Sequence, residues 1–409
     1  MTVRFSHLSA RLSRHPEAGA FVGFAAVFLF FAATAPETFL SHNSISSILT
    51  SQAVPGIIAI GITLLMISGE FDLSVGSIMG VSSLVFLYAA VNGIHILLSA
   101  LCGLAAGCAM GLGNGLLLVW TGIPSFIITL GTMLVYRAIS LTAISGGRII
   151  RYADYSRQDP MISLPPILLI LLSVSLFALI AWSTYRPLVG RLRDLRSRPR
   201  PDTSLAAFCL SATNLAAAYL VFFCAAHLAP RLSEPVRFSF FYLLNGRLPS
   251  EWIAGNYRIS ILWWLFLSLL FGLILTRTRY GNAIFATGGN AEAARAQGVP
   301  IARIRIANFT LSGGLAALAG IVQVARLKSV DPLRGDGLEL EVIAAVVIGG
   351  TLLSGGYGSI AGSCIGTALT GMLRTGLVLL SVPANAFRGA IGALVILAVI
   401  INTVVRKRR

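Results

Sequence analysis

The chain has very few charged residues for its length. Only 11% of its 409 residues are charged, 56% are hydrophobic, and the mean hydropathy is +0.84. A water-soluble protein needs more charge on its surface, so this composition excludes that class and indicates a chain surrounded by lipid. The net charge of +16 does not indicate nucleic acid, because the basic residues lie in separate loops between apolar runs and form no single patch.

Lysine is almost absent, and this excludes one source of energy. The two lysines, Lys328 and Lys407, follow Leu327 and Arg406, whereas a phosphate-binding P-loop has glycine before its lysine. The chain therefore has no Walker A site of its own.

Titratable groups are missing from the middle of the apolar runs. All 15 acidic residues fall in loops or at the ends of runs, and none of the five histidines is central. A carrier driven by protons or sodium usually keeps such a group near mid-bilayer, so ion coupling lacks its usual residue. No Ser/His/Asp set, HExxH motif or carboxylate pair indicates an enzyme. The five cysteines form no CxxC pair, and we expect neither a metal site nor a bound cofactor.

Long apolar runs dominate the sequence. A helix needs about 20 apolar residues to cross a bilayer, and the runs predict an all-α polytopic membrane protein with about twelve transmembrane segments. The expected segments are 18–36, 52–69, 73–92, 95–119, 125–146, 164–184, 205–229, 260–276, 306–326, 341–354, 359–381 and 386–405. The run 341–354 is short and ends among glycines, so we expect a broken or re-entrant piece there.

Small residues at every fourth position predict close packing between these helices. They occur in two runs, as Gly103, Gly107, Gly111 and Gly115 and as Gly362, Gly366 and Thr370.

The distribution of basic residues orients the chain. With the N-terminus inside, the inner segments hold 18 Lys or Arg and the outer loops hold nine. The positive-inside rule then places both termini in the cytoplasm. We expect residues 1–409 to form a single transmembrane domain, with a basic cytoplasmic loop over 185–204 and a second cytoplasmic loop over 277–305.

The second cytoplasmic loop contains a short helix with clear start and stop signals. Asn290 can cap its first turn, Glu292 lies near its positive end, and Arg295 lies near its negative end. Gly298 supplies a left-handed stop. A helix of about eight residues is too short to be stable alone in water. It is therefore either a segment that docks into a partner or an ordinary amphipathic connector.

A second polar stretch, GEFDLSVGS, joins the runs 52–69 and 73–92. Asp72 is expected to accept backbone N–H groups at the start of the following helix, from Leu73, Ser74 and Val75. The stretch is either a structural hairpin or a polar gate. Glu70 is expected to be a charged residue of the loop, exposed to solvent. The hairpin or gate residues are Gly69, Asp72, Ser74, Gly76 and Ser77.

Two arginines, Arg137 and Arg374, fall inside apolar runs. A charge within a span is a candidate site. They either line a polar path through the protein or a subunit interface, or they extend to the membrane surface or pair with backbone carbonyls. The aromatic residues expected at the outer membrane interface are Phe238, Phe240, Phe241 and Tyr242.

Four co-linear motifs resemble the permease subunit of ABC importers for monosaccharides, in the inner-membrane translocator family. They are GEFDLSVGS (69–77), IPSFIITLGTM (123–133), YGNAIFATGGNAEAARAQGV (280–299) and EVIAAVVIGGTLLSGGYGSIAG (341–362). Phe285 stands where the family usually has tyrosine. The runs 164–184 and 205–229 exceed the family's ten-helix plan, and their layout resembles the xylose-permease subgroup.

The resemblance implies a transport subunit without enzymatic activity in the bacterial inner membrane. Its solute would be a monosaccharide, such as xylose or a related pentose, sugar or polyol. The implied partners are a cytoplasmic ABC ATPase, a periplasmic sugar-binding protein, a second permease copy and membrane lipid. The residues implied in coupling to the ATPase are Gly289, Asn290, Glu292, Ala293, Ala294, Arg295 and Gly298.

Two other functions stay open at this point. A gradient-driven sugar carrier would transport without ATP, and a scaffold or receptor would not transport at all. Uptake by the isolated chain in ion-loaded vesicles would favour the carrier. Loss of uptake on replacing Glu292 or Arg295, with normal membrane insertion, would argue against the scaffold.

Overall fold

The structure is a computed structural model that describes residues 17–144, 147–164, 236–249, 254–383, 386–387, 389–394 and 396. The basic loop 185–204 and the predicted runs 164–184 and 205–229 lie outside the described residues, apart from Leu164. The chain divides into two units, and each is described by itself. The first comprises Met1–Asp159 and Phe240–Arg409, and the second comprises Pro160–Ser239. In the second unit, β2 (Met161–Leu164) pairs antiparallel with β3 (Val236–Ser239).

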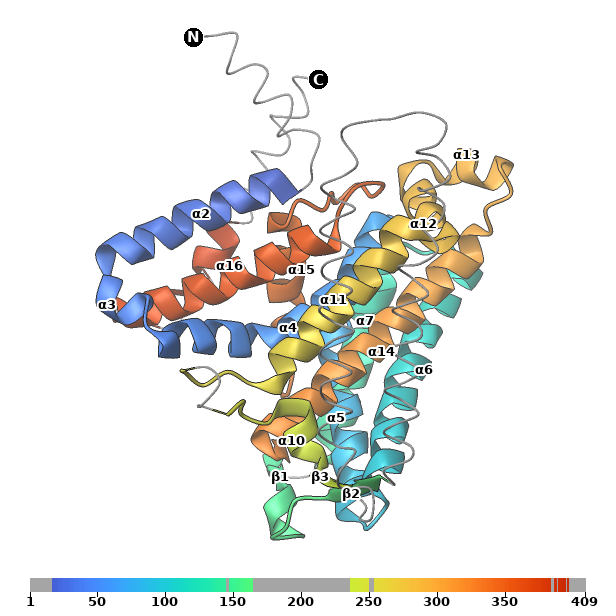
Figure 1. The fold of residues 1–409 in the computed structure, drawn as a ribbon. Coiled ribbons are helices and arrows are strands. Elements are labelled where there is room, and N and C mark those ends of the chain that lie inside the picture. The colour runs from blue at the N-terminus through green and yellow to red at the C-terminus, as the bar shows by residue number, and fades with distance from the viewer. Residues whose placement is uncertain are drawn as a thin grey trace, which may run out of the picture. The chain divides into compact units, whose positions relative to one another are not determined.

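The described part of the first unit is built from helices and one short ladder (Figure 1). The helices are α2 (Glu17–Thr34), α3 (Pro36–Phe39), α4 (His42–Ile67), α5 (Val75–Val91), α6 (Ile96–Thr121), α7 (Ser125–Ala143), η2 (Tyr152–Asp154), α10 (Phe240–Asn245), α11 (Ile259–Arg277), α12 (Arg279–Gly289), α13 (Ala291–Ala296), α14 (Ile301–Leu327), α15 (Leu338–Ile348) and α16 (Ile360–Leu379). The ladder joins β1 (Ile150–Arg151) to β4 (Ser329–Val330), antiparallel.

Five of these helices are long and apolar enough to cross a membrane: α4, α6, α7, α11 and α14. Two shorter apolar helices, Gly19–Thr34 and Val75–Val91, add to them. The prediction of a polytopic helical membrane protein is therefore confirmed for the described residues, and the count of twelve spans stays a prediction. The predicted run 52–69 is only the second part of a helix. α4 begins at His42, because Ser41 caps it by accepting the N–H of Ser44 at 3.2 Å.

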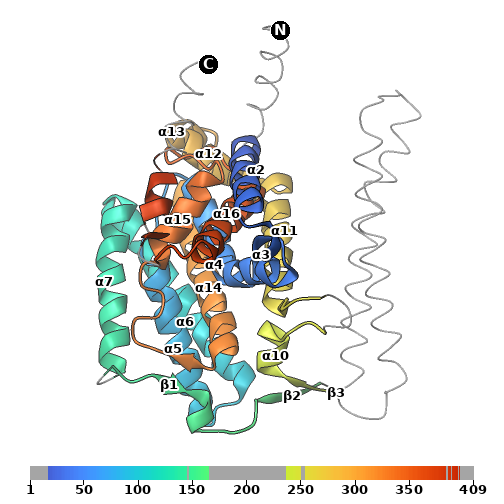
Figure 2. The ribbon, with the colours of Figure 1, turned by 90° about the vertical axis from the view of Figure 1, so that its left-hand side faces the viewer.

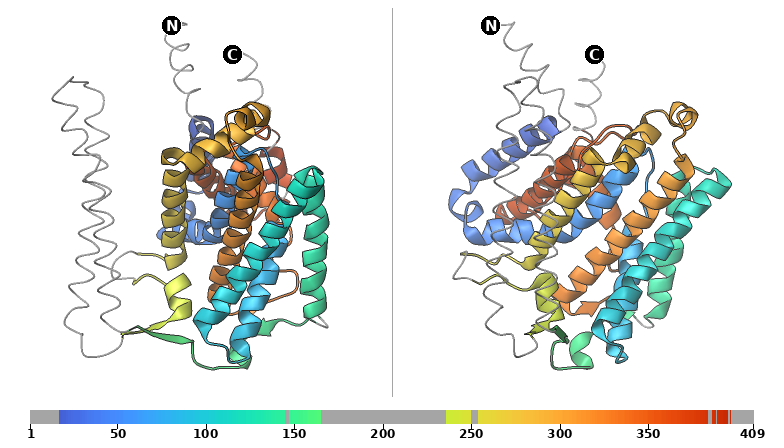
Figure 3. Two further views of the ribbon diagram at one scale, coloured as in Figure 1. Left: turned by 90° about the vertical axis from the view of Figure 1, so that its right-hand side faces the viewer. Right: turned by 45° about the vertical axis from the view of Figure 1, so that its right-hand side comes forward.

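The glycine stripe of α6 brings this helix close to α14. The two helices lie side by side in both views of Figure 3. An added Cβ at Gly111 would lie 3.0 Å from the carbonyl carbon of Phe309 and 3.2 Å from the Cα of Gly313. The backbones thus approach without intervening side chains, and the predicted close packing is confirmed. The second small-residue row behaves alike, with Gly366 packed against the backbone of Ala345 in α15.

A break separates α15 from α16. The helix α15 has 11 residues and ends at Ile348, and a non-helical segment follows before Ser359 caps α16 by accepting the N–H of Gly362 at 2.9 Å. The predicted broken piece is therefore present. Its return segment is held by the N–H of Gly356, which donates to the carbonyl of Ile67 at 2.8 Å.

Alanine substitutions on α6 test the packing of its glycine stripe. Gly111→Ala places a methyl group against the backbone of α14 and should lower the free energy of unfolding by about 1–3 kcal/mol. Gly113→Ala on the same helix meets no atom closer than Tyr136 Oη at 3.9 Å. It should be neutral or stabilising by up to about 1 kcal/mol, because alanine is the better helix former. Thermal unfolding in detergent, followed by tryptophan fluorescence, compares them. Equal melting temperatures would contradict this packing.

Candidate functional site

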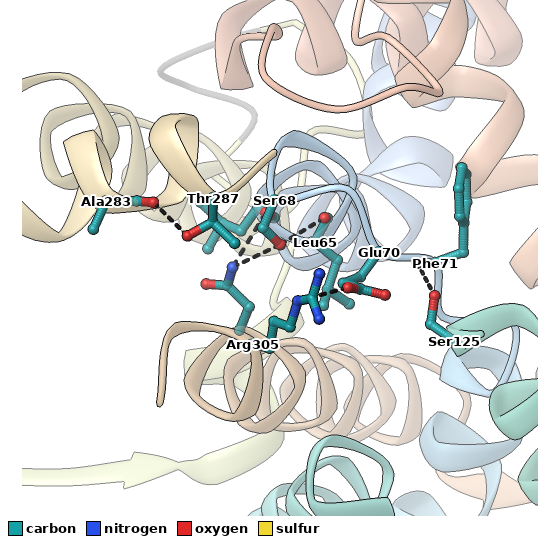
Figure 4. Close-up of polar contacts among 10 residues, drawn as sticks. Leu65, Ser68, Glu70, Phe71, Ser125, Ala283, Thr287 and Arg305 are labelled. Carbon is teal, nitrogen blue, oxygen red and sulfur yellow. Dashed lines mark hydrogen bonds and ion pairs between the residues drawn. The ribbon is translucent and has the colours of Figure 1, made fainter. Parts of the chain in front are cut away.

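The segment between α4 and α5 has no helix or strand to satisfy its backbone, and α7 supplies the missing partners. Ser125 Oγ accepts the N–H of Phe71 at 3.0 Å, a contact drawn in Figure 4, and Thr129 Oγ1 accepts the N–H of Leu73 at 3.1 Å. Gly69 starts the segment with φ +85°, a left-handed conformation that glycine adopts without strain.

The start of α5 lies well inside the length of its neighbours. Asn114 Nδ2 donates to Ser74 Oγ at 2.8 Å, and Asn114 precedes the end of α6 by seven residues. At 1.5 Å per residue, Ser74 is about 10 Å from that end. Asp72, two residues before Ser74, therefore lies deeper in the helix bundle than the sequence suggested. It does lie outside the helices, as predicted.

Asp72 is fully buried at this depth. Its Oδ1 accepts the N–H of Ser74 at 2.9 Å and the hydroxyl of Ser74 at 2.6 Å, and Ser312 Oγ lies 3.5 Å from its Oδ2. The predicted acceptance of a backbone N–H at the start of α5 is confirmed for Ser74. It is wrong for Leu73, whose N–H goes to Thr129.

Glu70 departs from expectation. It is only 5% exposed, and Arg305 Nε of α14 lies 2.8 Å from its Oε1 (Figure 4). The prediction of a solvated loop charge is wrong, because its partner lies far along the chain and no local pattern reveals it. Burial raises the pKa of Glu70, while Arg305 and the hydroxyl of Ser125 oppose that shift.

A separate chain of hydrogen bonds runs from the end of α4 to α12. Tyr280 Oη donates to Asn308 Oδ1 at 2.6 Å, and Asn308 Nδ2 donates to Ser68 Oγ at 3.0 Å. Burial raises the pKa of Tyr280 to about 12, so its hydroxyl stays protonated and keeps donating. The end of α4 is thereby tied to α12 through α14. Asn308 could have been noticed in the sequence as an amide inside an apolar run.

Glycines join three segments backbone to backbone beside this chain. An added Cβ at Gly355 would lie 2.9 Å from the Cα of Gly69, and one at Gly356 would lie 2.7 Å from the Cα of Gly289. An added Cβ at Gly69 would lie 3.7 Å from the Cα of Gly288. We call Gly69, Gly288, Gly289, Gly355 and Gly356 the glycine junction. It brings the predicted hairpin residue Gly69 together with the predicted coupling residue Gly289.

The predicted short helix follows this junction as α13. Asn290 Oδ1 accepts the N–H of Ala293 at 3.0 Å, and Gly298 has φ +82°. The predicted cap and stop are confirmed, although α13 has six residues rather than about eight. Glu292, Ala293 and Arg295 are exposed, and Ala294 is buried.

The sequence did not reveal the helix that precedes α13. Two adjacent glycines, Gly288 and Gly289, favour a break in a helix, but α12 runs through Gly288 and ends at Gly289. Thr278 Oγ1 caps its other end by accepting the N–H of Gly281 at 3.1 Å.

Both arginines inside apolar runs pair with carboxylates near α15. Arg137 Nη2 lies 2.8 Å from Asp336 Oδ1 and 3.5 Å from Glu339 Oε1. Arg374 Nη2 lies 2.7 Å from Glu341 Oε2. The partners of both arginines are thus carboxylates, which the sequence analysis did not predict.

Arg137 and Arg374 differ in what lies around them. An added Cβ at Gly76 would touch Glu339 Oε2, which brings the start of α5 together with the ion pairs of Arg137. Arg374 instead lies over the ring of Phe387 at 4.5 Å. Gly76 and Arg137 are thus linked through Glu339, whereas Arg374 pairs with Glu341. The roles of both arginines stay predictions.

Part of the predicted aromatic interface is core instead. Phe240 and Phe241 are 5% and 2% exposed, and their rings lie 5.9 Å from Phe86 and 5.1 Å from Tyr152. These two residues therefore hold α10 against the helices, and the position of the cluster at the membrane interface stays a prediction. Tyr242 is exposed.

The architecture defines a polytopic α-helical membrane protein with interrupted helices and a capped helix exposed at one end. Comparison with known proteins gives the family. A family described as "Branched-chain amino acid transport system / permease component" matches residues 44–400. The chain belongs to this family.

Three curated relatives match over most of their length. The xylose transport system permease protein XylH of Escherichia coli (strain K12) is 32% identical over 94% of this chain and 90% of the relative. The ribose import permease protein RbsC of the same strain is 29% identical over 90% and 88%. The autoinducer 2 import system permease protein LsrC of Yersinia pseudotuberculosis serotype IB is 29% identical over 89% and 78%. The resemblance to permease subunits of monosaccharide ABC importers is thereby confirmed. No solved structure matches the chain.

A double-mutant cycle tests the ion pair between Glu70 and Arg305. Arg305→Gln leaves a buried carboxylate without its cation and should lower the free energy of unfolding by about 2 kcal/mol at pH 8. Glu70→Gln added to it should restore most of that loss. Because burial raises the pKa of Glu70, the folded single variant takes up a proton more readily than the unfolded chain, and its stability should rise as pH falls. The double variant should lack this rise. Melting temperatures between pH 8 and pH 5.5 measure both effects, and parallel curves for the two variants would contradict the pairing.

Proposed function

We propose that the chain is the membrane permease subunit of an ATP-driven importer for a monosaccharide, in the bacterial inner membrane. The main support for this proposal is the match to xylose and ribose permeases, which covers about nine-tenths of this chain and of each relative. Xylose or a related pentose or polyol is the proposed solute, because XylH is 32% identical over 94% of this chain and the extra pair of runs resembles that subgroup.

The chain has no Walker A lysine, so it does not hydrolyse ATP at a P-loop of its own. We assign ATP hydrolysis to a cytoplasmic ABC ATPase, delivery of the sugar to a periplasmic binding protein, and the complete path to a pair of permease copies. The surplus of basic residues on one side supports cytoplasmic termini and a cytoplasmic position for 277–305.

The exposed helix α13 is proposed as the contact for the ATPase. A six-residue helix gains little stability by itself, and its exposed Glu292, Ala293 and Arg295 are free to meet a partner surface. The glycine junction then offers a direct route inward. Movement of α12 would be transmitted at Gly288 to the segment that starts at Gly69, because backbone contacts leave no flexible side chains between them.

Substitutions on α13 test the coupling. The double variant Glu292→Ala/Arg295→Ala should lower ATP-dependent sugar uptake at least about tenfold, as expected when an interface loses about 1.4 kcal/mol or more. Its abundance in the membrane should stay normal, because both side chains are exposed. Uptake of labelled D-xylose and D-ribose by cells that express the chain together with an ABC ATPase and a periplasmic sugar-binding protein provides the measurement.

The control is Arg277→Ala, which removes an exposed cation at the end of α11 and should leave uptake unchanged. Normal uptake by the α13 variant would disprove the coupling role. Uptake by the purified chain alone, in ion-loaded vesicles without ATP, would show a gradient-driven carrier instead.

A further inference from the structure

Two helix N-termini meet within the length of the spanning helices. An added Cβ at Gly76, in the first turn of α5, would touch the carbonyl of Gly335 just before α15. In Figure 2 the chain climbs from β4 along α5 to reach this point. The N-terminus of a helix carries a partial positive charge and free N–H groups. This meeting point therefore suits oxygen atoms.

Three ionisable side chains surround the meeting point. Arg137 comes from α7, Glu339 from the first turn of α15, and Asp336 from the loop before it. Arg137 is 12 residues from the start of α7 and six from its end, so it lies about 18 Å and about 9 Å from the two ends. The ion pairs of Arg137 fix the two carboxylates at the same depth.

This cluster is partly open. The side chain of Asp336 is 47% exposed and that of Arg137 is 25% exposed. Charged groups at such depth face protein or a water-filled cavity, because exposure to lipid is costly. We therefore expect water to reach this face of the chain in the membrane.

Unpartnered polar atoms point into the same place. Glu339 is 5% exposed, and its Oε2 has no hydrogen-bond partner among the described residues. That atom is the one an added Cβ at Gly76 would touch. One turn further along α5, an added Cβ at Gly80 would lie 3.7 Å from Ser140 Oγ of α7, which is also buried without a partner among the described residues. Buried polar atoms are normally bonded, so this carboxylate oxygen and this hydroxyl are available to hydrogen-bond a molecule that enters the site.

We propose that Arg137, Asp336 and Glu339 form a binding site for hydroxyl groups of an uncharged polyhydroxyl solute that reaches them through water. The proposal rests on the sugar-permease function and names the residues that recognise the solute. Carboxylates accept hydrogen bonds from hydroxyl groups, and a guanidinium donates to their oxygen atoms. One cation against two carboxylates does not suit an anionic solute. The rival explanation is an ion-pair cluster that only holds α7 to α15.

The first test measures water access independently of transport. Asp336→Cys in the full chain, in membrane vesicles, should react with a membrane-impermeant sulfonated methanethiosulfonate above the level of the unmodified chain. D-Xylose or D-ribose at saturating concentration should slow that reaction. The control, Val135→Cys, lies two residues from Arg137 on another face of α7 and is 57% exposed in the chain, where we expect lipid. Reaction at both positions, or at neither, would overturn the proposal.

The second test asks whether the cluster recognises hydroxyl groups. We compare uptake of the transported sugar with uptake of its monodeoxy derivatives. Any discrimination by other subunits is the same for each permease variant, so a change in the ratio reports on this chain alone. Glu339→Gln should reduce the preference for the parent sugar at one deoxy position by about 10- to 100-fold, the effect of a hydrogen bond to a charged group.

Lys328→Gln is the matched control, because it breaks an ion pair with Asp159 at the β4 end of the chain. It should leave the sugar preference unchanged. Unmodified chain that takes up no sugar would overturn the proposed function together with this site. Normal preference in Glu339→Gln, beside working unmodified chain, would overturn the site alone.

Discussion

The structure depends on the need to satisfy non-helical backbone at membrane depth. Within a bilayer an unbonded N–H or C=O costs several kcal/mol, so irregular segments survive only where protein supplies partners. Here hydroxyls of Ser125 and Thr129 accept the N–H groups of the segment before α5, and Ile67 accepts the N–H of Gly356 from the segment after α15. These bonds connect α7, α4 and both interruptions, so the two breaks are held as one arrangement.

Close backbone contact is the second constraint, and it follows from the first. Segments can bond to one another's main chain only if side chains do not hold them apart. The glycine junction achieves this between α12, the segment before α5 and the segment after α15, and the α6 stripe achieves it against α14. In a membrane, where no hydrophobic force draws helices together, such contact is also a main source of packing energy. A push applied to α12 therefore meets rigid neighbours.

Local signals in the sequence predicted the features that depend on a few adjacent residues. Each of these features depends on residues that are close together in the sequence. They are the cap at Asn290, the stop at Gly298, the glycine stripe and the break after Ile348. The partners of Glu70, Arg137 and Arg374 could not be predicted in this way, because each ion pair joins segments that only the fold brings together. The continuation of α12 through Gly288 shows the same limit, since tertiary contact offsets the cost of glycine in a helix.

The depth of the acidic residues changes how their distribution should be interpreted. In the sequence every carboxylate is at the end of a run, which suggested that none lies near the middle of the membrane. Asp72 and Glu339 are indeed at helix starts, but α5 and α15 start inside the bundle, so these residues lie deep. An interrupted helix thus places carboxylates at depth at its own start, and Arg137 of the spanning helix α7 pairs with one of them, Glu339. For an uncharged sugar this is the required arrangement, because oxygen acceptors and donors suffice and no fixed ion is needed to balance a transported charge.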